Sequence, residues 1–255
     1  MIIDTHVHLD VKKMIKNLDE ILFRARENGV KKFVIPAIDS NDMERLVSIV
    51  NNNDDIFFAV GHHPNNSTEI SFEEIKKYSK HKKCVAIGEC GLDWFRIHKG
   101  DDIRQVKLKQ KDLFRKQLSL AEELNLPVIL HSRETDEDML EVLSEFNVKG
   151  VIHCYVGSKK LLSLLDRNFY FGIGGVITYS SAIELKENIH KIPIENIVLE
   201  TDAPYLTPVP FRNKRNESSY LENILLEISN ILKLDKTELE DTFEKNTYSL
   251  FPKLV

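Results

Sequence analysis

The sequence predicts a single-domain α/β protein of the (β/α)8 TIM-barrel class. Short runs rich in β-branched and aromatic residues recur along the chain, and a polar segment with helical periodicity follows each run. Strands that alternate with helices form parallel sheets, and eight such units suffice to close a barrel. An open doubly wound sheet is the alternative that the same pattern allows. The runs cover residues 1–6, 33–37, 56–61, 84–89, 127–131, 150–154, 169–174 and 196–201.

The segments between these runs carry helix signals. The stretches Ser71-Phe72-Glu73-Glu74 and Thr135-Asp136-Glu137-Asp138 resemble capping boxes, in which side chains satisfy the free amides at a helix start. Residues 102–125 place an apolar stripe among charged side chains, which predicts a long helix with one packed face. Beyond the last run we expect a proline-containing loop and two terminal helices, at residues 203–216, 217–232 and 236–250.

Length and composition favour one domain, residues 1–255, in a reducing compartment. A hydrophobic content of 42% in 255 residues is enough to bury a substantial core without disulfide bonds. Cys84, Cys90 and Cys154 show no Cys-x-x-Cys spacing and are odd in number, which argues against a disulfide framework. No membrane span or secretion signal is predicted from the hydropathy pattern. We therefore expect a cytoplasmic protein.

Imidazoles and carboxylates stand at the ends of the predicted strands. His6 and His8 are two residues apart, and side chains of a strand alternate between its faces, so both project to the same side. Two imidazoles on one side of a strand end can hold a metal ion. Active sites of barrels lie at the carboxyl ends of the strands, so residues at the ends of other runs should converge with this pair. These residues are His63, Glu89, His131, His153 and Asp202.

Each of these residues has a structural alternative, such as a hydrogen-bonded core histidine or a buried ion pair. Alternation separates some neighbours. Cys154, beside His153, is expected to turn toward the helices and is left out of the ligand set. His62 is expected to pack in the interior. Glu200 shares its parity with Asp202, and it either supports the site or forms a structural salt bridge.

A series of motifs covers nearly the whole chain in order. The motifs are Asp4-Thr5-His6-Val7-His8, Gly88-Glu89-Cys90-Gly91-Leu92-Asp93, Leu130-His131-Ser132-Arg133, His153-Cys154-Tyr155-Val156-Gly157-Ser158, Glu200-Thr201-Asp202-Ala203-Pro204-Tyr205-Leu206, and Asn246-Thr247 with Leu250-Phe251. They resemble the motifs of the TatD family, metal-dependent deoxyribonucleases of the amidohydrolase-like barrel superfamily. The combination is far more specific than any single motif.

The resemblance implies a phosphodiesterase site with two divalent metal ions and a 3′–5′ exonuclease-type deoxyribonuclease activity. Asp202 and Glu89 are then the catalytic residues, because Asp202 takes a proton from the attacking water and Glu89 bridges the ions. Imidazole and carboxylate ligands suit Zn or Mn, and Mg where carboxylates and water dominate. The implied ligands are His6, His8 and Asp202 for one ion and His131 and His153 for the other, with Glu89 shared.

Substrate phosphates must be held by local groups, because 35 basic against 40 acidic residues give a formal net charge of -5. His63 matches the histidine of the family's Gly-x-His-Pro motif and is expected to contact phosphate. Arg133 is a second candidate. Arg212, Lys214 and Arg215 form a basic patch in the loop at 203–216, for which a solvated loop is the alternative.

Two features near these residues leave alternatives open. The basic loop resembles the family pattern Pro-x-x-Arg-Gly-Lys-x-Asn-Glu but carries Asn213 in place of the glycine, which puts its conformation in doubt. Trp94 and Phe95 either stack on a base at the pocket rim or cover the top of the barrel.

Other functions on the same barrel are a metal-dependent amidase, a lactonase or a small phosphoester hydrolase. Many relatives on the wider fold bridge their metals with a modified lysine on the fourth strand, and Glu89 at this position favours the nuclease branch. Outside the enzymes, a metal-dependent binding protein is the alternative. The expected partner is DNA that is single-stranded or frayed at its end, and neither a membrane nor an obligatory protein partner is predicted.

Overall fold

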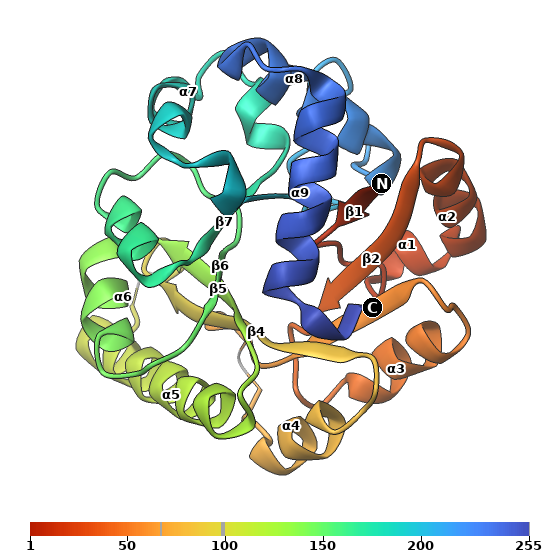
Figure 1. Cartoon of the computed structure of the whole chain (residues 1–255). Helices are drawn as coiled ribbons and strands as arrows, with labels where there is room; N and C mark the ends of the chain where they lie inside the picture. Colours follow the sequence, from red (N-terminus) through yellow and green to blue (C-terminus); the bar gives the residue numbers. More distant parts are fainter. Residues whose placement is uncertain (67, 98–99, 255) are drawn as a thin grey trace.

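The computed structural model describes residues 1–66, 68–97 and 100–254, and its centre is a barrel of parallel strands (Figure 1). Among these residues eight strands pair in sequence order, each parallel to the next. The first and last strands meet where the Thr5 amide donates to the Leu199 carbonyl at 3.1 Å. The strands are β1 (Ile2–Asp4), β2 (Val30–Pro36), β3 (Ile56–Val60), β4 (Cys84–Asp93), β5 (Val128–Arg133), β6 (Gly150–Ile152), β7 (Tyr170–Ile173) and β8 (Ile197–Leu199).

The predicted barrel is confirmed, and its closure excludes the open doubly wound sheet. Two strands are longer than their apolar runs suggest. β2 begins at Val30 because Val30 already pairs with Ile2 of β1. β4 continues past Glu89 because its last residues pair with β5, up to the pair of Asp93 and Arg133. This extension carries several side chains of β4 toward the mouth of the barrel.

Helices cover the outside of the barrel (Figure 1). The long helix expected at 102–125 is observed, and both terminal helices form. The α-helices are α1 (Lys12–Ile15), α2 (Leu18–Glu27), α3 (Met43–Asn51), α4 (Phe72–Ser79), α5 (Ile103–Leu124), α6 (Asp136–Leu143), α7 (Ile183–Asn188), α8 (Leu221–Leu232) and α9 (Lys236–Leu250). Short 3₁₀ helices are η1 (Leu161–Arg167), η2 (Gly175–Thr178), η3 (Ile189–Lys191), η4 (Ile194–Asn196), η5 (Ser218–Tyr220) and η6 (Pro252–Leu254).

The two predicted capping boxes have different outcomes. Ser71 caps α4, and its hydroxyl accepts a hydrogen bond from the Glu74 amide at 3.3 Å. The cap predicted at Thr135 is wrong, because its side chain makes no bond to the first turn of α6. The Thr135 hydroxyl instead pairs with the hydroxyl of Ser132 at 2.8 Å. A neighbouring strand end therefore competes with the helix for this side chain.

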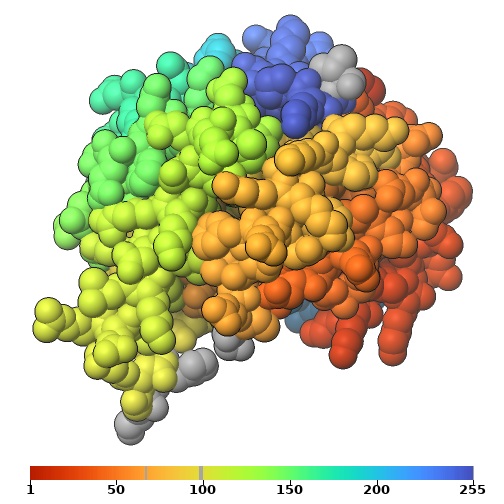
Figure 2. Space-filling model, turned by 90° about the horizontal axis from the view of Figure 1, so that it is seen from below, coloured from red at the N-terminus to blue at the C-terminus, as the bar shows by residue number. Residues whose placement is uncertain are grey.

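The C-terminal segment closes the end of the barrel at which the strands begin. α9 crosses this end in Figure 1, and Phe251 and Leu254 pack against interior side chains such as Val34. The ammonium group of Met1, just before β1, lies 2.7 Å from Glu244 of α9. Figure 2 shows the first part of α5 (yellow) projecting beyond the body of the molecule at the end opposite α9 (blue). The carboxyl ends of the strands open toward this opposite end.

Two further observations bear on the predictions from composition. Cys84, Cys90 and Cys154 are free thiols, and burial raises the pKa of the Cys84 thiol to about 12. This thiol therefore stays protonated at neutral pH. In the part of the chain that the structure describes, no helix combines the length and the apolar character needed to cross a membrane.

Candidate metal centre

The segments that follow β1 and β8 bring imidazoles and carboxylates together beside Glu89. The Nε2 atoms of His6 and His8 lie 3.3 Å apart, as their spacing predicts. Glu89 Oε2 lies 3.3 Å from His6 Nε2. Asp202 Oδ1 lies 3.3 Å from His8 Nε2. His6, His8 and Glu89 are buried, and the Asp202 side chain is 14% exposed. Within this first group, Asp202 is therefore the ligand most exposed to solvent.

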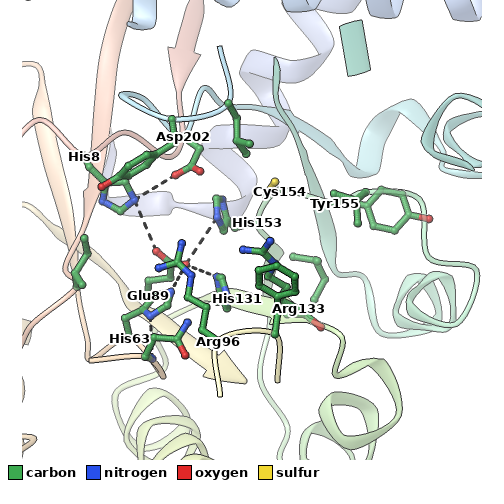
Figure 3. Close-up of a pocket in the computed structure, with 18 of the residues that line it drawn as sticks. His8, His63, Glu89, Arg96, His131, Arg133, His153, Cys154, Tyr155 and Asp202 are labelled. Carbon is green, nitrogen blue, oxygen red and sulfur yellow. Dashed lines mark hydrogen bonds and ion pairs between the residues drawn. The ribbon is translucent and has the colours of Figure 1, made fainter. Parts of the chain in front are cut away.

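The other carboxylate oxygen of Glu89 faces a second group of imidazoles. Glu89 Oε1 lies 2.9 Å from His131 Nδ1 and 3.4 Å from His63 Nε2. It also lies 3.8 Å from His153 Nε2. Figure 3 shows these side chains pointing toward one another around Glu89. Glu89 thus lies between the two groups, with one oxygen turned toward each.

Two further carboxylates hold the outer sides of the imidazoles. His153 Nδ1 donates to Glu200 Oε1 at 3.0 Å, and His131 Nε2 donates to Asp93 Oδ2 at 3.0 Å. Asp93 also accepts a bond from Asn65 Nδ2 at 2.5 Å. Such bonds fix the orientation of an imidazole and leave its other nitrogen free to act as a ligand. Glu200 therefore lies behind His153 and supports the site, which is the first of the two alternatives that the sequence allows.

The charges of the cluster are strongly coupled. Burial opposes the ionisation of Glu89, but the surrounding imidazoles outweigh burial and hold the pKa of Glu89 well below its usual range. Burial likewise opposes the charge of His153, but the charges of Glu200 and Glu89 raise the pKa of His153 to about 10. Burial raises the pKa of Asp202, but the hydrogen bond from His8 and the nearby imidazoles outweigh burial and lower this pKa. Glu89 and Asp202 are therefore ionised at neutral pH.

Asp4 anchors the chain on both sides of the first group. Its Oδ1 accepts hydrogen bonds from the Thr201 amide at 3.0 Å and from the His6 amide at 3.3 Å. Its Oδ2 accepts a bond from the Ser218 hydroxyl at 2.6 Å. Because Thr201 precedes Asp202, this buried carboxylate fixes the position of Asp202 relative to the histidine pair.

A glycine permits the close approach of β4 and β5 beneath the cluster. Gly91 has a φ of 141°, and a Cβ at this position would lie 2.1 Å from the His131 carbonyl oxygen. A larger residue would therefore push apart the two strands that carry Glu89 and His131.

The donor set fits a divalent metal ion. Three overlapping trios, His6–His153–Asp202, His6–His8–Glu89 and His63–Glu89–His131, each place their ligand atoms within 4.8 Å of one another. Imidazole nitrogen and carboxylate oxygen are the ligands that Zn and Mn prefer, and carboxylate oxygen also suits Mg. The structure brings together all six residues predicted as ligands and adds His63 to them.

A cavity of about 1360 Å³ lies over the cluster and includes Arg133 in its wall. The Arg133 guanidinium lies 3.6 Å from the centre of the Phe95 ring, which also lines the cavity. Trp94 has a different environment, because its Nε1 donates to Asp138 at 2.9 Å and its ring packs against the core. Trp94 therefore packs within the fold beside α6, whereas Phe95 lies at the cavity. The cationic side chains that line the cavity are Arg45, Arg96, Arg133, Lys159 and Lys160.

The structure places the basic residues of the loop after β8 outside the wall of this cavity. Arg212, Lys214 and Arg215 do not line the cavity. Arg212 stacks on Tyr179, with its guanidinium 3.9 Å from the ring centre, and Arg215 donates to the Lys13 carbonyl at 2.6 Å. Aromatic and backbone partners within the fold therefore hold these arginines. The cavity takes its positive charge from other loops.

The prediction that Cys154 turns toward the helices is wrong. β6 ends at Ile152, and Cys154 has a φ of 48°, so strand alternation no longer applies to it. Its amide donates to Glu200 at 2.7 Å, and its side chain lines the cavity (Figure 3). His62 packs in the interior as expected, with Nδ1 3.2 Å from the Ser40 hydroxyl.

Sequence reasoning missed several residues of the site. Asp93 could have been found, because it shares strand parity with Glu89 and ends the same motif. Arg96, Tyr205 and Asp10 also line the cavity, but they lie in irregular segments where no periodicity reports direction.

Comparison with known proteins agrees with this geometry. A family model described as TatD related DNase matches residues 3–252. A Bacillus subtilis protein named "Uncharacterized metal-dependent hydrolase YabD" is 36% identical over 98% of this chain and 99% of its own length. The "3'-5' ssDNA/RNA exonuclease TatD" of Erwinia tasmaniensis is 32% identical over 97% of this chain and 98% of its own.

A solved structure shares the whole architecture. The crystal structure of YjjV, a TatD homologue from Escherichia coli K12, is 30% identical, covers 98% of each chain and has a TM-score of 0.89. Since the family model covers nearly the whole chain and the relatives align over their full lengths, this protein belongs to the TatD family of metal-dependent hydrolases.

Proposed function

We propose that this protein hydrolyses phosphodiester bonds of DNA, nucleotide by nucleotide from the 3′ end, with divalent metal ions at the buried cluster. The observation that carries the proposal is the position of Glu89, whose two oxygens face two groups of imidazoles. Two adjacent ions suit phosphodiester hydrolysis, because both the attacking and the leaving oxygen carry charge in the transition state. The relative named a 3'-5' ssDNA/RNA exonuclease, at 32% identity, supports the substrate class.

We assign two ions, Mg, Mn or Zn, to the cluster. Bound there, the ions would lower the pKa of a coordinated water and neutralise charge on the phosphate. Glu200 and Asp93 would keep the ligand nitrogens of His153 and His131 directed inward. The proposed ligands are His6, His8 and Asp202 for one ion, His131 and His153 for the other, and Glu89 for both.

Asp202 and Arg133 are assigned to the reacting groups. Asp202 is ionised and partly exposed to the cavity, so its carboxylate can accept the proton of the attacking water. Arg133 presents a planar fork of donors at the cavity wall, which suits a phosphate. His63 lies beside Glu89 with its side chain 13% exposed, and we assign it to phosphate contact.

The depth of the cluster favours a single-stranded or frayed end as the substrate. The ligands lie below the mouth of the barrel and are mostly buried, so a stacked duplex cannot place its phosphate against them. A cavity of about 1360 Å³ exceeds the roughly 300 to 1,000 Å³ of small-molecule sites, so it has room for more than a mononucleotide. This space favours a nucleic acid over a small ester or lactone.

A cytoplasmic location is part of the proposal. It is supported by three cysteines that are all free thiols, since reduced cysteines are typical of the cytosol.

The test uses purified protein, chelator-treated and then supplied with Mn or Mg, with 5′-labelled single-stranded DNA. We expect a ladder of products that shorten from the 3′ end. We expect Asp202→Asn to lower kcat by at least about a hundredfold, because the proton acceptor is lost. Asp166→Asn, at an exposed position on η1, should retain wild-type activity.

Other outcomes would point to other functions. Binding of DNA without cleavage in Mn, Mg and Zn would favour a metal-dependent binding protein. Turnover of a model amide, lactone or phosphate monoester without DNA cleavage would favour one of the other hydrolases of this barrel. The cleavage rate of a single-stranded RNA of the same sequence shows whether the enzyme distinguishes ribose from deoxyribose.

A further inference from the structure

One wall of the cavity contains a buried carboxylate that the cluster does not use. Asp10 follows His8 on the segment after β1, lines the cavity and is 6% exposed. Its Oδ1 has no hydrogen-bond partner among the residues that the structure describes. Asp10 is also outside the trios of possible metal ligands found in this part of the chain. A buried carboxylate oxygen without a donor is costly, so it indicates a donor that arrives with a ligand.

The two sides of the cavity differ in charge. Near Asp10, the wall contains Asp39, Asp42 and Arg45 from the segment after β2 and the start of α3. The Arg45 guanidinium pairs with Asp42, which offsets its charge within this wall. This side therefore has an excess of negative charge and disfavours a polyanion.

The opposite side is formed by the loops that follow β4, β5 and β6. In the barrel order β1 to β8, β5 and β6 lie across from β1 and β2, and β4 is next to β5. Figure 3 shows His8 on one side of the cluster and Arg133 and Tyr155 on the other. Among the described residues, the cations on that side are Arg96, Arg133, Lys159 and Lys160, of which Lys160 pairs with Glu137 at 2.6 Å. The carboxylates that line the same wall are Glu134, Asp136 and Glu184, so this side is less acidic than the side of Asp10.

We propose that Asp10 accepts a hydrogen bond from the free 3′-hydroxyl of the terminal nucleotide, so that the enzyme requires an unphosphorylated 3′ end. The inference rests on the proposed function. The terminal nucleoside occupies the acidic side, and the remaining chain with its phosphates crosses the cationic side. Water adds to the last phosphodiester phosphorus, the bond to the 3′-oxygen of the preceding nucleotide breaks, and that oxygen takes up a proton. The released 5′-mononucleotide keeps its 3′-hydroxyl on Asp10.

The acidic side would also disfavour binding of a strand whose 3′ end is modified. A 3′-phosphate would bring negative charge next to Asp10, Asp39 and Asp42, and a 3′-deoxy end would leave Oδ1 without a donor. Both modified ends should therefore be poor substrates, for different physical reasons.

The experiment compares three oligonucleotides of one single-stranded sequence that end in 3′-hydroxyl, 3′-hydrogen or 3′-phosphate. For the wild-type protein with Mn, we expect kcat/KM to be at least about tenfold higher for the hydroxyl end than for either other end. Asp10→Ala should reduce this preference to within about threefold. Asp10→Asn keeps an acceptor oxygen but no charge, so it should lose discrimination against phosphate and retain part of the preference over hydrogen. Asp19→Asn, at an exposed position on α2, should keep the wild-type ratios.

The ratios between ends separate recognition from a loss of folding, because a merely destabilised variant loses activity on all three substrates alike. Equal cleavage of the three ends by the wild-type protein would overturn the inference and leave the proposed nuclease intact. An unchanged preference in both Asp10 variants would do the same. Absence of cleavage of every substrate by the wild-type protein would overturn the proposed function and this inference with it.

Discussion

Glu200 bonds to the His153 ring and to the Cys154 amide, and through His153 it orients one ligand of the cluster. Its carboxylate accepts from the His153 ring at 3.0 Å and from the Cys154 amide at 2.7 Å. We expect Glu200→Gln to weaken metal binding by about 10- to 100-fold, because the neutral amide no longer stabilises the required ring orientation. Competition with a chromophoric chelator measures the affinity. Glu195→Gln, outside the cavity, is the matched control and should bind like the wild type.

A neighbouring glycine offers a second approach to the same bond. A Cβ at position 172 would lie 2.2 Å from Glu200 Oε2, so Gly172→Ala should displace the carboxylate and weaken metal binding in the same direction. Unchanged affinity in both Glu200→Gln and Gly172→Ala would show that His153 needs no outer partner.

At this scale the sequence predicts what strand geometry controls. His6 and His8 lie beyond β1, but Val7 between them forms a β-bridge with Ala203, so the two-residue spacing still returns both side chains to the same face. The direction of Cys154 could not be predicted, since its left-handed backbone follows the end of β6 and no residue pattern reports where a strand ends. Asp10 was missed for a related reason, because it lies in a turn beyond β1.

At the scale of elements, an ion pair ties α2 to the segment before α8. Arg24 donates to both carboxylate oxygens of Glu217, at 2.9 and 2.7 Å. Burial opposes the ionisation of Glu217, but the bonds from Arg24 and Ser219 outweigh it and lower the pKa of Glu217 below its ordinary value of 4.5. The depressed pKa means that this stabilisation is present above pH 4.5 and is lost as pH falls through the folded-state pKa.

We therefore expect Arg24→Met to lower the free energy of unfolding by about 1 kcal/mol at pH 7, a modest value because the Arg24 side chain is partly exposed. The difference from wild type should be smaller at about pH 3.5 than at pH 7, because Glu217 takes up a proton as pH falls. Urea unfolding at both pH values measures it, and the double variant with Glu217→Gln tests the coupling. A difference that does not vary with pH would mean that Arg24 acts through packing of its side-chain stem.

Element type could be predicted more reliably than the local use of polar side chains. The apolar periods of the runs and of α5 are long enough to fix strand or helix. The Thr135 hydroxyl bonds to a strand-end hydroxyl and Arg212 packs on the Tyr179 ring, and neither tertiary neighbour can be predicted from the local sequence pattern. The hydrogen-bond partner of a polar side chain is set by the tertiary structure, and the local sequence does not identify that partner.

For the whole molecule, the two ends of the barrel have different roles, because one end is packed with apolar side chains and the other carries the polar cluster. The C-terminal residues Leu250, Phe251 and Leu254 close the end where the strands begin. The clustered imidazoles and carboxylates gather at the other end, where burying so many charged groups together opposes folding. A bound cation would offset the repulsion among the carboxylates, so the metal ion should stabilise the fold as well as support the reaction.

The last prediction follows from this coupling. Addition of Mn or Zn to chelator-treated protein, at about 100 times the dissociation constant, should stabilise the fold by about 2.7 kcal/mol. For a chain of this length such a gain raises Tm by roughly 5 to 10 °C. At one fixed metal concentration, the gain should be larger at about pH 8 than at about pH 6, because protons compete with the metal for the imidazoles and raise the dissociation constant at the lower pH. The direction of this pH dependence follows from His153, whose pKa of about 10 means that metal binding must displace a proton at neutral pH.

Differential scanning calorimetry with and without EDTA measures the shift in Tm, and isothermal titration calorimetry in buffers of different ionisation enthalpy counts the protons released. A Tm that rises equally at both pH values, without proton release, would contradict binding through these histidines.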